Sequence, residues 1–315
     1  MAESDLHLLV KMDCERVARY APDMGGPESW SLSEKAIKGW ATLLSKRGLV
    51  GSFGIHPEAA AHHKELFLEL ADEGFELHLQ FHAGNFRGLE YRCYLGSYGR
   101  REQTEILTKA REDWMRALER PPRTFTPGGG SLNDDTWPVV YELGFRQAGM
   151  PLERNNPRVY SVTVGACPFP HHANPQDRLL PGSLELYVVP VTINWRRKIP
   201  SGAKHIDLRP EGIASLEVHK ETIDQNIEIM SRLNPPVKVL VVPTHNTRDY
   251  SNSANSVRKT LESTLDYVKA SAKEKGLRIT PATFESIHLT AHKCGCSLEE
   301  EWELYRRWQR TFVNR

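Results

Sequence analysis

The sequence predicts an α/β protein whose parallel β-sheet closes, or nearly closes, into a barrel. Segments with strand and helix patterns alternate through most of the chain, and such units build parallel sheets because a helix usually connects two parallel strands. The chain has 315 residues, enough to bury the large core that such a sheet requires. This length is compatible with one domain or two, and we expect a single domain over residues 1–315.

The first predicted strand covers residues 6–12, an apolar run interrupted only by His7 and Lys11. A run of this kind is typical of a strand buried within a sheet. A loop rich in proline and glycine follows, and residues 33–46 are then expected to form a helix. Its apolar residues recur at helical spacing: Ile37, Trp40, Leu43 and Leu44.

The next two strands are expected at residues 49–55 and 73–82, on either side of a helix over 58–73. The second of these strands alternates strictly between apolar and polar residues, the period of a strand with two different faces. A long helix should follow over 101–119. Its apolar residues lie on one helical face: Ile106, Leu107, Ala110, Trp114 and Leu118.

The second half of the chain begins with an irregular stretch near residues 150–205. Its many prolines predict loops and hairpins over one face of the sheet, with strand-like sequence at 184–193. The strand–helix alternation then returns with a helix at 221–233, a strand at 237–242 and a helix at 256–275.

The carboxyl-terminal region, near 297–315, predicts an amphipathic helical extension that carries Trp302 and Trp308. Such a helix could cover the barrel or a neighbouring subunit, so a homo-oligomer is compatible with it. A compact cluster precedes it and could either close a second, structural zinc site or form a reduced loop. The cluster consists of His288, His292, Cys294 and Cys296.

The first strand ends in two acidic residues, Asp13 and Glu15, separated by one small residue. At the carboxyl end of a barrel strand both carboxylates can face the active-site end of the fold. One could complete a metal site while the other takes a proton from water, two roles that need separate acids close together. The alternative is a helix start, with Asp13 as its N-cap.

The third predicted strand places His78, Gln80 and His82 on one face. A group of neutral nitrogen atoms on one face is what a divalent transition metal binds. The alternative is a half-exposed strand with solvated histidines.

Composition excludes several classes of protein. Lys and Arg number 41 against 40 Asp and Glu, so no charge excess indicates nucleic acid or an anionic membrane as partner. No signal peptide and no membrane-spanning segment is visible, and five cysteines, an odd number, fit a reducing compartment. We therefore expect a cytoplasmic protein that does not bind membranes.

Several short motifs occur in an order that resembles the polysaccharide deacetylases, also called the NodB-homology family or carbohydrate esterase family four. The similarity covers roughly residues 6–150 and 236–290, and the order of the motifs is more specific than any one of them. The motifs are Asp13-Cys14-Glu15, Ser52-Phe53, Asp72-Glu73-Gly74-Phe75-Glu76, residues 123–130 with Asn133 and Thr136, Glu142-Leu143-Gly144-Phe145, and residues 239–245.

This resemblance implies a distorted (β/α) barrel of the NodB-homology type and a metal-dependent hydrolase of carbon–nitrogen bonds. In that family an aspartate and two histidines hold a divalent metal. By resemblance, Asp13 would be the general base and Glu15 the metal carboxylate, with His78 and His82 as nitrogen ligands. Such a mixed set suits zinc or a neighbouring first-row ion. His245 would be the acid that protonates the leaving amine.

The resemblance also implies a substrate-binding turn at Pro127, Gly128 and Gly129, whose backbone could stabilise a tetrahedral oxyanion. Two positions depart from the family pattern. Gln80 stands where the family has its first metal histidine, so Gln80 could be a ligand or a substrate contact. Thr126 replaces the arginine that usually orients the base, a role that Arg87 or Arg123 could take. Arg87 is also expected to contact the substrate.

Together these features predict an enzyme that removes an N-acetyl group from an amino sugar or a related small-molecule or sugar-linked amide. One alternative is a catalytically inactive binding protein with an inherited site, which the shifted histidines and Thr126 favour. Another is a non-sugar amidase of the same superfamily.

Overall fold

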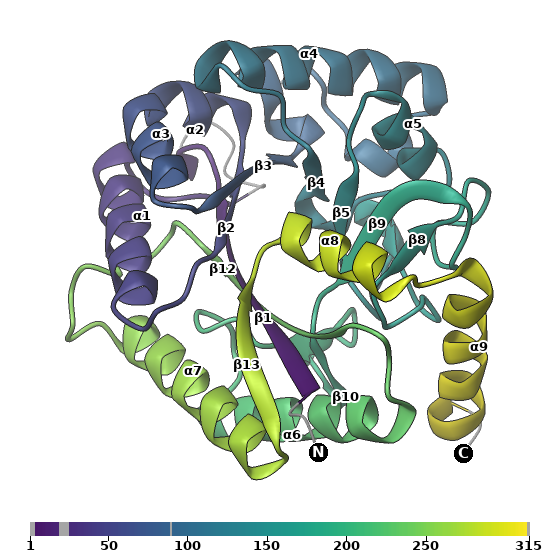
Figure 1. Cartoon of the computed structure of the whole chain (residues 1–315). Helices are drawn as coiled ribbons and strands as arrows, with labels where there is room; N and C mark the ends of the chain where they lie inside the picture. The colour runs from purple at the N-terminus through teal and green to yellow at the C-terminus, as the bar shows by residue number, and fades with distance from the viewer. Residues whose placement is uncertain (1–3, 19–24, 89, 314–315) are drawn as a thin grey trace.

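The computed structural model describes residues 4–18, 25–88 and 90–313, and a nine-stranded sheet lies at its centre. The strands follow the order β12-β1-β2-β3-β4-β5-β9-β8, and β13 also pairs with β1. The sheet curls into an open barrel (Figure 1), which confirms the predicted fold class. The strands are β1 (Ser4–Cys14), β2 (Ser52–Ile55), β3 (Glu76–Phe81), β4 (Thr124–Pro127), β5 (Gln147–Met150), β8 (His171–Ala173), β9 (Leu184–Pro190), β12 (Lys238–His245) and β13 (Leu277–Ala282).

Helices surround this sheet. In Figure 1, α1 to α5 follow the upper and left rim, α6 and α7 lie along the lower edge, and α9 lies beside the carboxyl terminus. The helices are α1 (Trp30–Ser45), α2 (Pro57–His62), α3 (Lys64–Asp72), α4 (Arg100–Leu118), α5 (Thr136–Glu142), α6 (Leu216–Leu233), α7 (Ser256–Glu274), α8 (Phe284–Cys294) and α9 (Leu298–Trp308).

Most predicted elements are confirmed, and the differences are local. The helix expected over 58–73 is two helices, α2 and α3, because His63 between them leaves the helical conformation, with φ −110° and ψ 30°. The strand-like segment 184–193 becomes β9, which pairs in parallel with β5 in the main sheet, and the start of β10 (Ile193–Lys198). Strand β10 forms a hairpin with β11 (His205–Asp207), and a smaller hairpin joins β6 (Asn155–Asn156) to β7 (Ser161–Val162).

Strand β1 is the central element of the barrel. One edge pairs with β12 from Leu6 to Asp13, and the other edge pairs first with β13 and then with β2. Its even-numbered residues belong to the large apolar core against the helices, whereas Leu9 packs in a second cluster with Val189, Val241 and Phe284. Lys11 and Asp13 follow Leu9 on the same face because side chains alternate along a strand.

Helix α8 closes the amino-terminal end of the barrel. The backbone N–H of Phe284 donates to Glu76 Oε2 at 2.9 Å, and Thr124 Oγ1 donates to Glu76 Oε1 at 2.8 Å. Glu76 and Thr124 begin β3 and β4, so these bonds tie the helix to the strand starts.

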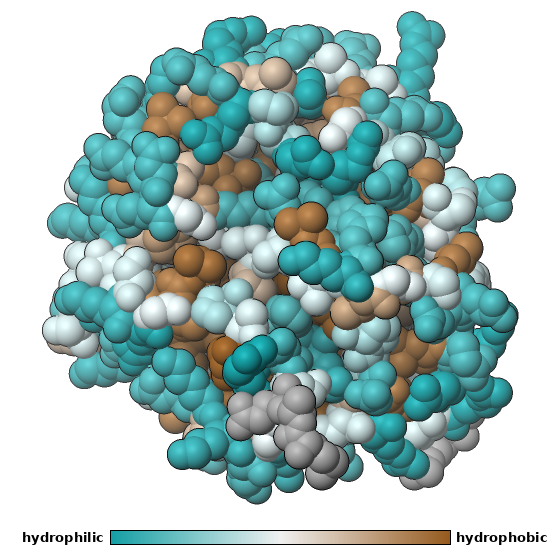
Figure 2. All heavy atoms as spheres, in the orientation of Figure 1, coloured by the Kyte–Doolittle hydropathy of each residue, from teal (hydrophilic) through white to brown (hydrophobic). Residues whose placement is uncertain are grey.

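The outer surface matches this arrangement of apolar layers. Figure 2 shows hydrophilic side chains over most of the visible face, with hydrophobic residues mainly in the recesses between them. None of the helices in the described ranges is long and apolar enough to cross a membrane.

One side-chain hydrogen bond bridges the opening of the barrel between β9 and β12. The backbone N–H of Val241 donates to Thr192 Oγ1 at 2.8 Å, and both residues are buried. We predict that Thr192→Val lowers the free energy of unfolding by about 1–3 kcal/mol, because the buried amide loses its acceptor. Chemical denaturation measures this change. Thr192→Ser keeps the hydroxyl and serves as the control; an equal loss in both variants would contradict the role of the bond.

Candidate active site

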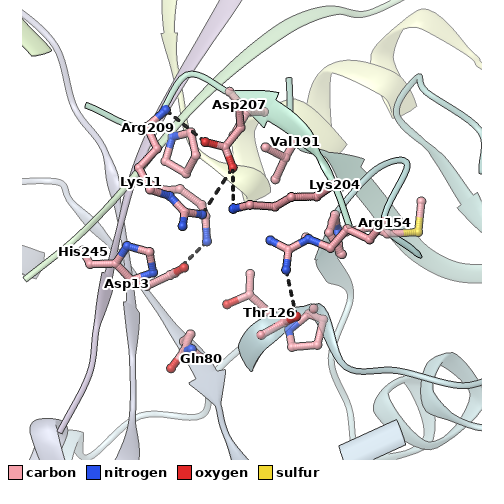
Figure 3. Close-up of a pocket in the computed structure, with 18 of the residues that line it drawn as sticks. Lys11, Asp13, Gln80, Thr126, Arg154, Val191, Lys204, Asp207, Arg209 and His245 are labelled. Carbon is pink, nitrogen blue, oxygen red and sulfur yellow. Dashed lines mark hydrogen bonds and ion pairs between the residues drawn. The ribbon is translucent and has the colours of Figure 1, made fainter. Parts of the chain in front are cut away.

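A cavity of about 350 Å³ opens at the carboxyl ends of β1, β3, β4 and β12. This is the end where α/β barrels carry out their chemistry. Of the predicted site residues, the ones that line the cavity are Asp13, Glu15, Gln80, His82, Pro127, Gly129 and His245. Figure 3 shows part of this wall, with Asp13 beside His245 and opposite Arg154.

Asp13 and His245 are neighbours because their strands pair in register at this position. Lys11 Nζ donates to Asp13 Oδ1 at 2.6 Å. Burial favours the neutral form of Asp13, but the charges of Lys11 and His245 outweigh it and lower the pKa of the carboxyl. Asp13 is therefore an ionised carboxylate at neutral pH that faces the cavity.

His245 is oriented by a second carboxylate, that of Glu211. The His245 Nδ1 atom lies 2.7 Å from Glu211 Oε1, and Thr244 Oγ1 donates to Glu211 Oε2 at 2.7 Å. Tyr250 contacts the same threonine hydroxyl. This arrangement holds one ring nitrogen of His245 and leaves the other, Nε2, without a hydrogen-bond partner among the described residues.

Glu15 forms the other charged centre of the cavity. Its Oε1 atom lies 3.0 Å from His82 Nε2 and accepts a hydrogen bond from Gln80 Nε2 at 2.9 Å. Burial works against both charges, but the mutual attraction prevails, lowering the pKa of Glu15 and raising that of His82. Asn246 holds the Glu15 backbone through one donated and one accepted hydrogen bond. Glu15 Oε2 is buried and has no hydrogen-bond partner within the described ranges.

His78 lies deeper in the barrel than the cavity. It is fully buried, its ring packs edge-on against Phe284 at 5.2 Å, and neither ring nitrogen has a hydrogen-bond partner in the described structure. Burial lowers the pKa of His78 to about 3, so the ring is neutral. Gly54 separates it from Asp13: a Cβ atom there would lie 2.7 Å from both His78 Nε2 and Asp13 Oδ1.

The predicted metal ligands Glu15, His78 and His82 therefore do not gather around one point. Alternation along β3 correctly put both histidines on the interior face, but four residues of strand span more than 10 Å, which places them at different depths. Among the described residues, no group of three His, Cys, Asp or Glu side chains could hold a metal ion. The donors beside Glu15 are one imidazole and one amide.

The glycine-rich turn after β4 contributes mainly space. Pro127 and Gly129 line the cavity, whereas Gly128 packs behind His82, where an added Cβ would lie 2.4 Å from the imidazole ring. Gly129 has φ +62°, a conformation that favours glycine. Pro127 has no amide hydrogen, so it cannot donate a backbone hydrogen bond to an oxyanion, and within Pro127–Gly129 only the N–H groups of the two glycines could do so.

Other predicted residues lie elsewhere. Arg87 forms two hydrogen bonds of 2.9 Å with Asp113 on α4, outside the cavity, so the structure does not support its expected contact with substrate. Arg123 Nε lies 3.8 Å from Glu285 Oε1, and Arg123 does not line the cavity. Thr126 does line the cavity, and its hydroxyl has no hydrogen-bond partner among the residues that the structure describes.

The second zinc site, which the sequence left open as an alternative to a reduced loop, does not assemble. The His288 and His292 rings lie 4.4 Å apart, but His288 Nδ1 is engaged by Gln147 at 2.9 Å and Cys294 is exposed. No metal-binding group includes these residues in the part of the chain that the structure describes.

Five charged residues of the cavity wall were not predicted as site residues from the sequence: Lys11, Arg154, Lys204, Asp207 and Arg209. The last two, with Glu211, are spaced two residues apart, the same alternation that singled out the histidines of β3. This signal was present, but the surrounding prolines favoured a loop. Nothing in the local sequence marks Arg154.

The contact between Gly128 and His82 makes a direct prediction. Gly128→Ala should displace His82 from Glu15, because the new methyl group would overlap the ring, and should lower the free energy of unfolding by about 1–3 kcal/mol. A crystal structure and chemical denaturation measure the two effects. Gly99→Ala, where a Cβ meets nothing closer than 4.0 Å, is the matched control. An unmoved His82 with unchanged stability would contradict the packing argument.

Comparison with known proteins supports the fold. No protein-family model and no curated protein matches the chain. A solved structure described as a polysaccharide deacetylase from Mycobacterium smegmatis superimposes with a TM-score of 0.59 at 14% identity, covering 94% of this chain and 96% of that one. The PuuE allantoinase gives 0.61 at 12% identity, with coverages of 91% and 90%. A protein described as a polysaccharide deacetylase from Pseudomonas aeruginosa PAO1 gives 0.58 at 14% identity, with coverages of 91% and 91%. The chain therefore has the NodB-homology fold of the polysaccharide deacetylases.

Proposed function

We propose that this protein is a hydrolase that cleaves a carbon–nitrogen amide bond of a small molecule, such as the N-acetyl group of an amino sugar or a related metabolite. The main observation is that an ionised carboxylate, Asp13, and an oriented imidazole, His245, face one cavity from adjacent strands. Proteins named for deacetylation and for allantoin hydrolysis share the fold. The cavity volume of about 350 Å³ suits a metabolite rather than a folded polymer chain.

The proposed reaction divides proton transfer between these two residues. Asp13 accepts a proton from a water molecule, whose oxygen attacks the carbonyl carbon of the amide. His245 then donates a proton to the nitrogen as the carbon–nitrogen bond breaks, so that a carboxylic acid and an amine leave. Glu211 serves as a positioning residue, because its bond to Nδ1 aims Nε2 at the cavity.

Developing negative charge on the carbonyl oxygen could be stabilised from two sides of the cavity. Lys11 and His82 both line the cavity. Lys11 is a cation beside Asp13, and the Glu15 carboxylate raises the pKa of His82, which favours its protonated form. The amide hydrogens of the glycine turn are a further candidate. Fixed donors of this kind usually contribute more to catalysis than to substrate binding, because they are preorganised for the transition state.

The donors around Glu15 determine whether the reaction could depend on a metal. A zinc-dependent reaction would require Gln80 to join Glu15 and His82, a set with only one imidazole in the described residues. This set does not match the expected ligands of a catalytic zinc. We therefore propose that acidic and basic side chains of the protein transfer the protons without a metal.

An inactive binding protein is the competing function, and one contact favours it. The 2.6 Å ion pair with Lys11 stabilises the charge on Asp13 and makes it a weaker base. A non-sugar amidase would use the same residues on a different amide. Turnover assays on both substrate classes separate these functions.

The first test measures release of acetate or amine from soluble N-acetyl amino sugars and from small cyclic amides. We predict turnover that Asp13→Asn and His245→Gln each reduce by about 10²- to 10⁴-fold, the usual contribution of general acid–base catalysis. Arg87→Gln changes a charged residue outside the cavity and should not affect the rate. Equal activity in all variants would exclude the assigned roles, and absence of turnover on every substrate would favour the binding protein.

The second test addresses the metal. We predict that dialysis against a strong chelator leaves turnover unchanged and that elemental analysis finds less than one equivalent of metal per chain. Glu15→Gln should nevertheless lower activity, because His82 loses its charged partner. If chelation abolished activity and added zinc restored it, a metal would be required and the proposal of metal-free proton transfer would be wrong.

A further inference from the structure

One wall of the cavity carries a group of positively charged side chains, which we call the cationic wall and define as Arg154, Lys204 and Arg209. Asp207 lies among them: its Oδ2 atom is 3.4 Å from Arg209 Nη2 and 3.8 Å from Lys204 Nζ. Figure 3 shows Lys204 and Arg154 extending toward the same space, opposite Asp13. Two of the three residues come from the β10–β11 hairpin and the segment after it, which places the wall on one side of the reacting groups.

Arg154 forms no ion pair with any residue in the described ranges. Its Nη1 atom donates to the carbonyl oxygen of Gly129 at 2.9 Å, and the charges of Asp207 and Asp13 act on it from beyond ion-pair distance. An arginine that is only partly exposed usually faces a carboxylate or a phosphate, because its planar group offers paired donors to two oxygen atoms. The guanidinium group therefore has donors available inside the cavity.

The cations of this wall differ in their ion pairs. Lys204 and Arg209 lie within ion-pair distance of Asp207, and Arg209 also lies 3.9 Å from Glu211, whereas Arg154 forms no ion pair in the described ranges. Burial opposes the protonated forms of Lys204 and Arg154, lowering the pKa of Lys204 to about 8 and that of Arg154 to about 10. An anion bound between these two groups would offset this electrostatic cost.

We propose that the substrate carries a carboxylate group, which binds between Arg154 and Lys204 while its amide lies against Asp13 and His245. This inference rests on the proposed function and narrows the substrate class to amides that bear one carboxylate, such as N-acyl amino acids and acidic N-acetyl sugars. Phosphate is less suitable because the second negative charge of its usual dianion would add repulsion with the Asp13 carboxylate, which lines the same cavity.

The experiment compares two probes that differ only in charge, N-acetylglycine and N-acetylglycinamide. Binding to the full chain is measured by titration calorimetry at millimolar probe concentrations, with inorganic phosphate as a third probe. We expect N-acetylglycine to bind more tightly than the neutral amide. Arg154→Gln should weaken N-acetylglycine by about 10- to 100-fold, as expected for loss of a charge-assisted hydrogen bond, and should leave the neutral probe unchanged. Lys204→Met should act in the same direction.

Arg197→Gln is the matched control, since Arg197 lies on the same hairpin but is 56% exposed and paired with Glu221. The inference would be overturned if N-acetylglycine and N-acetylglycinamide bound equally well, or if neither bound. It would also be overturned if phosphate bound more tightly than N-acetylglycine, or if Arg154→Gln and Arg197→Gln weakened binding equally. Hydrolysis is assayed separately. Carboxylate-selective binding without turnover of any amide would reject the proposed function while supporting the anion site, and turnover of neutral amides alone would do the opposite.

Discussion

The pairing of β1 on both edges is the constraint on which the site depends. Its register with β12 sets Asp13 beside His245, and its register with β2 sets Asp13 beside Gly54, the residue that leaves room for His78. A shift of one residue would turn Asp13 into the apolar layer, since neighbouring side chains point to opposite faces. The hydrophobic packing of the even-numbered residues of β1 therefore also fixes the geometry of the polar face.

The interior of the barrel changes character along its length. Near α8 the interior is closed by hydrogen bonds to Glu76 and then by a layer of apolar side chains, and the charged side chains of the cavity lie toward the carboxyl ends of the strands. Each of the two carboxylates at the end of β1 has a cationic or imidazole neighbour: Lys11 for Asp13, and His82 for Glu15. Such pairing keeps buried carboxylates ionised, which a proton acceptor requires.

The fold could be predicted from the sequence to a large extent, because strand and helix periods were clear and β1, α4 and β12 lie close to their expected ranges. The face of β3 was also predictable, but the depth of His78 was not, since alternation fixes direction and not position along the barrel. Arg87 was predicted as a site residue only from its position in the sequence. Its hydrogen-bond partner in the structure, Asp113, is 26 residues away on α4. The cationic wall was missed because prolines and short strands obscure the local pattern, and because Arg154 reaches the cavity only through tertiary structure.

The partners of β1 have a consequence for the order of folding. The strands that cover the edges of β1 along residues 4–9, β12 and β13, lie more than 220 residues later in the chain. Until they are synthesised, the apolar strand β1 exposes unpaired backbone groups, a condition that favours association with other chains. Closure must also wait for contacts of very long sequence separation, which slows folding. The central strand of the finished barrel is thus prone to association with other chains during biosynthesis, and a chaperone that covered this segment would protect the nascent chain.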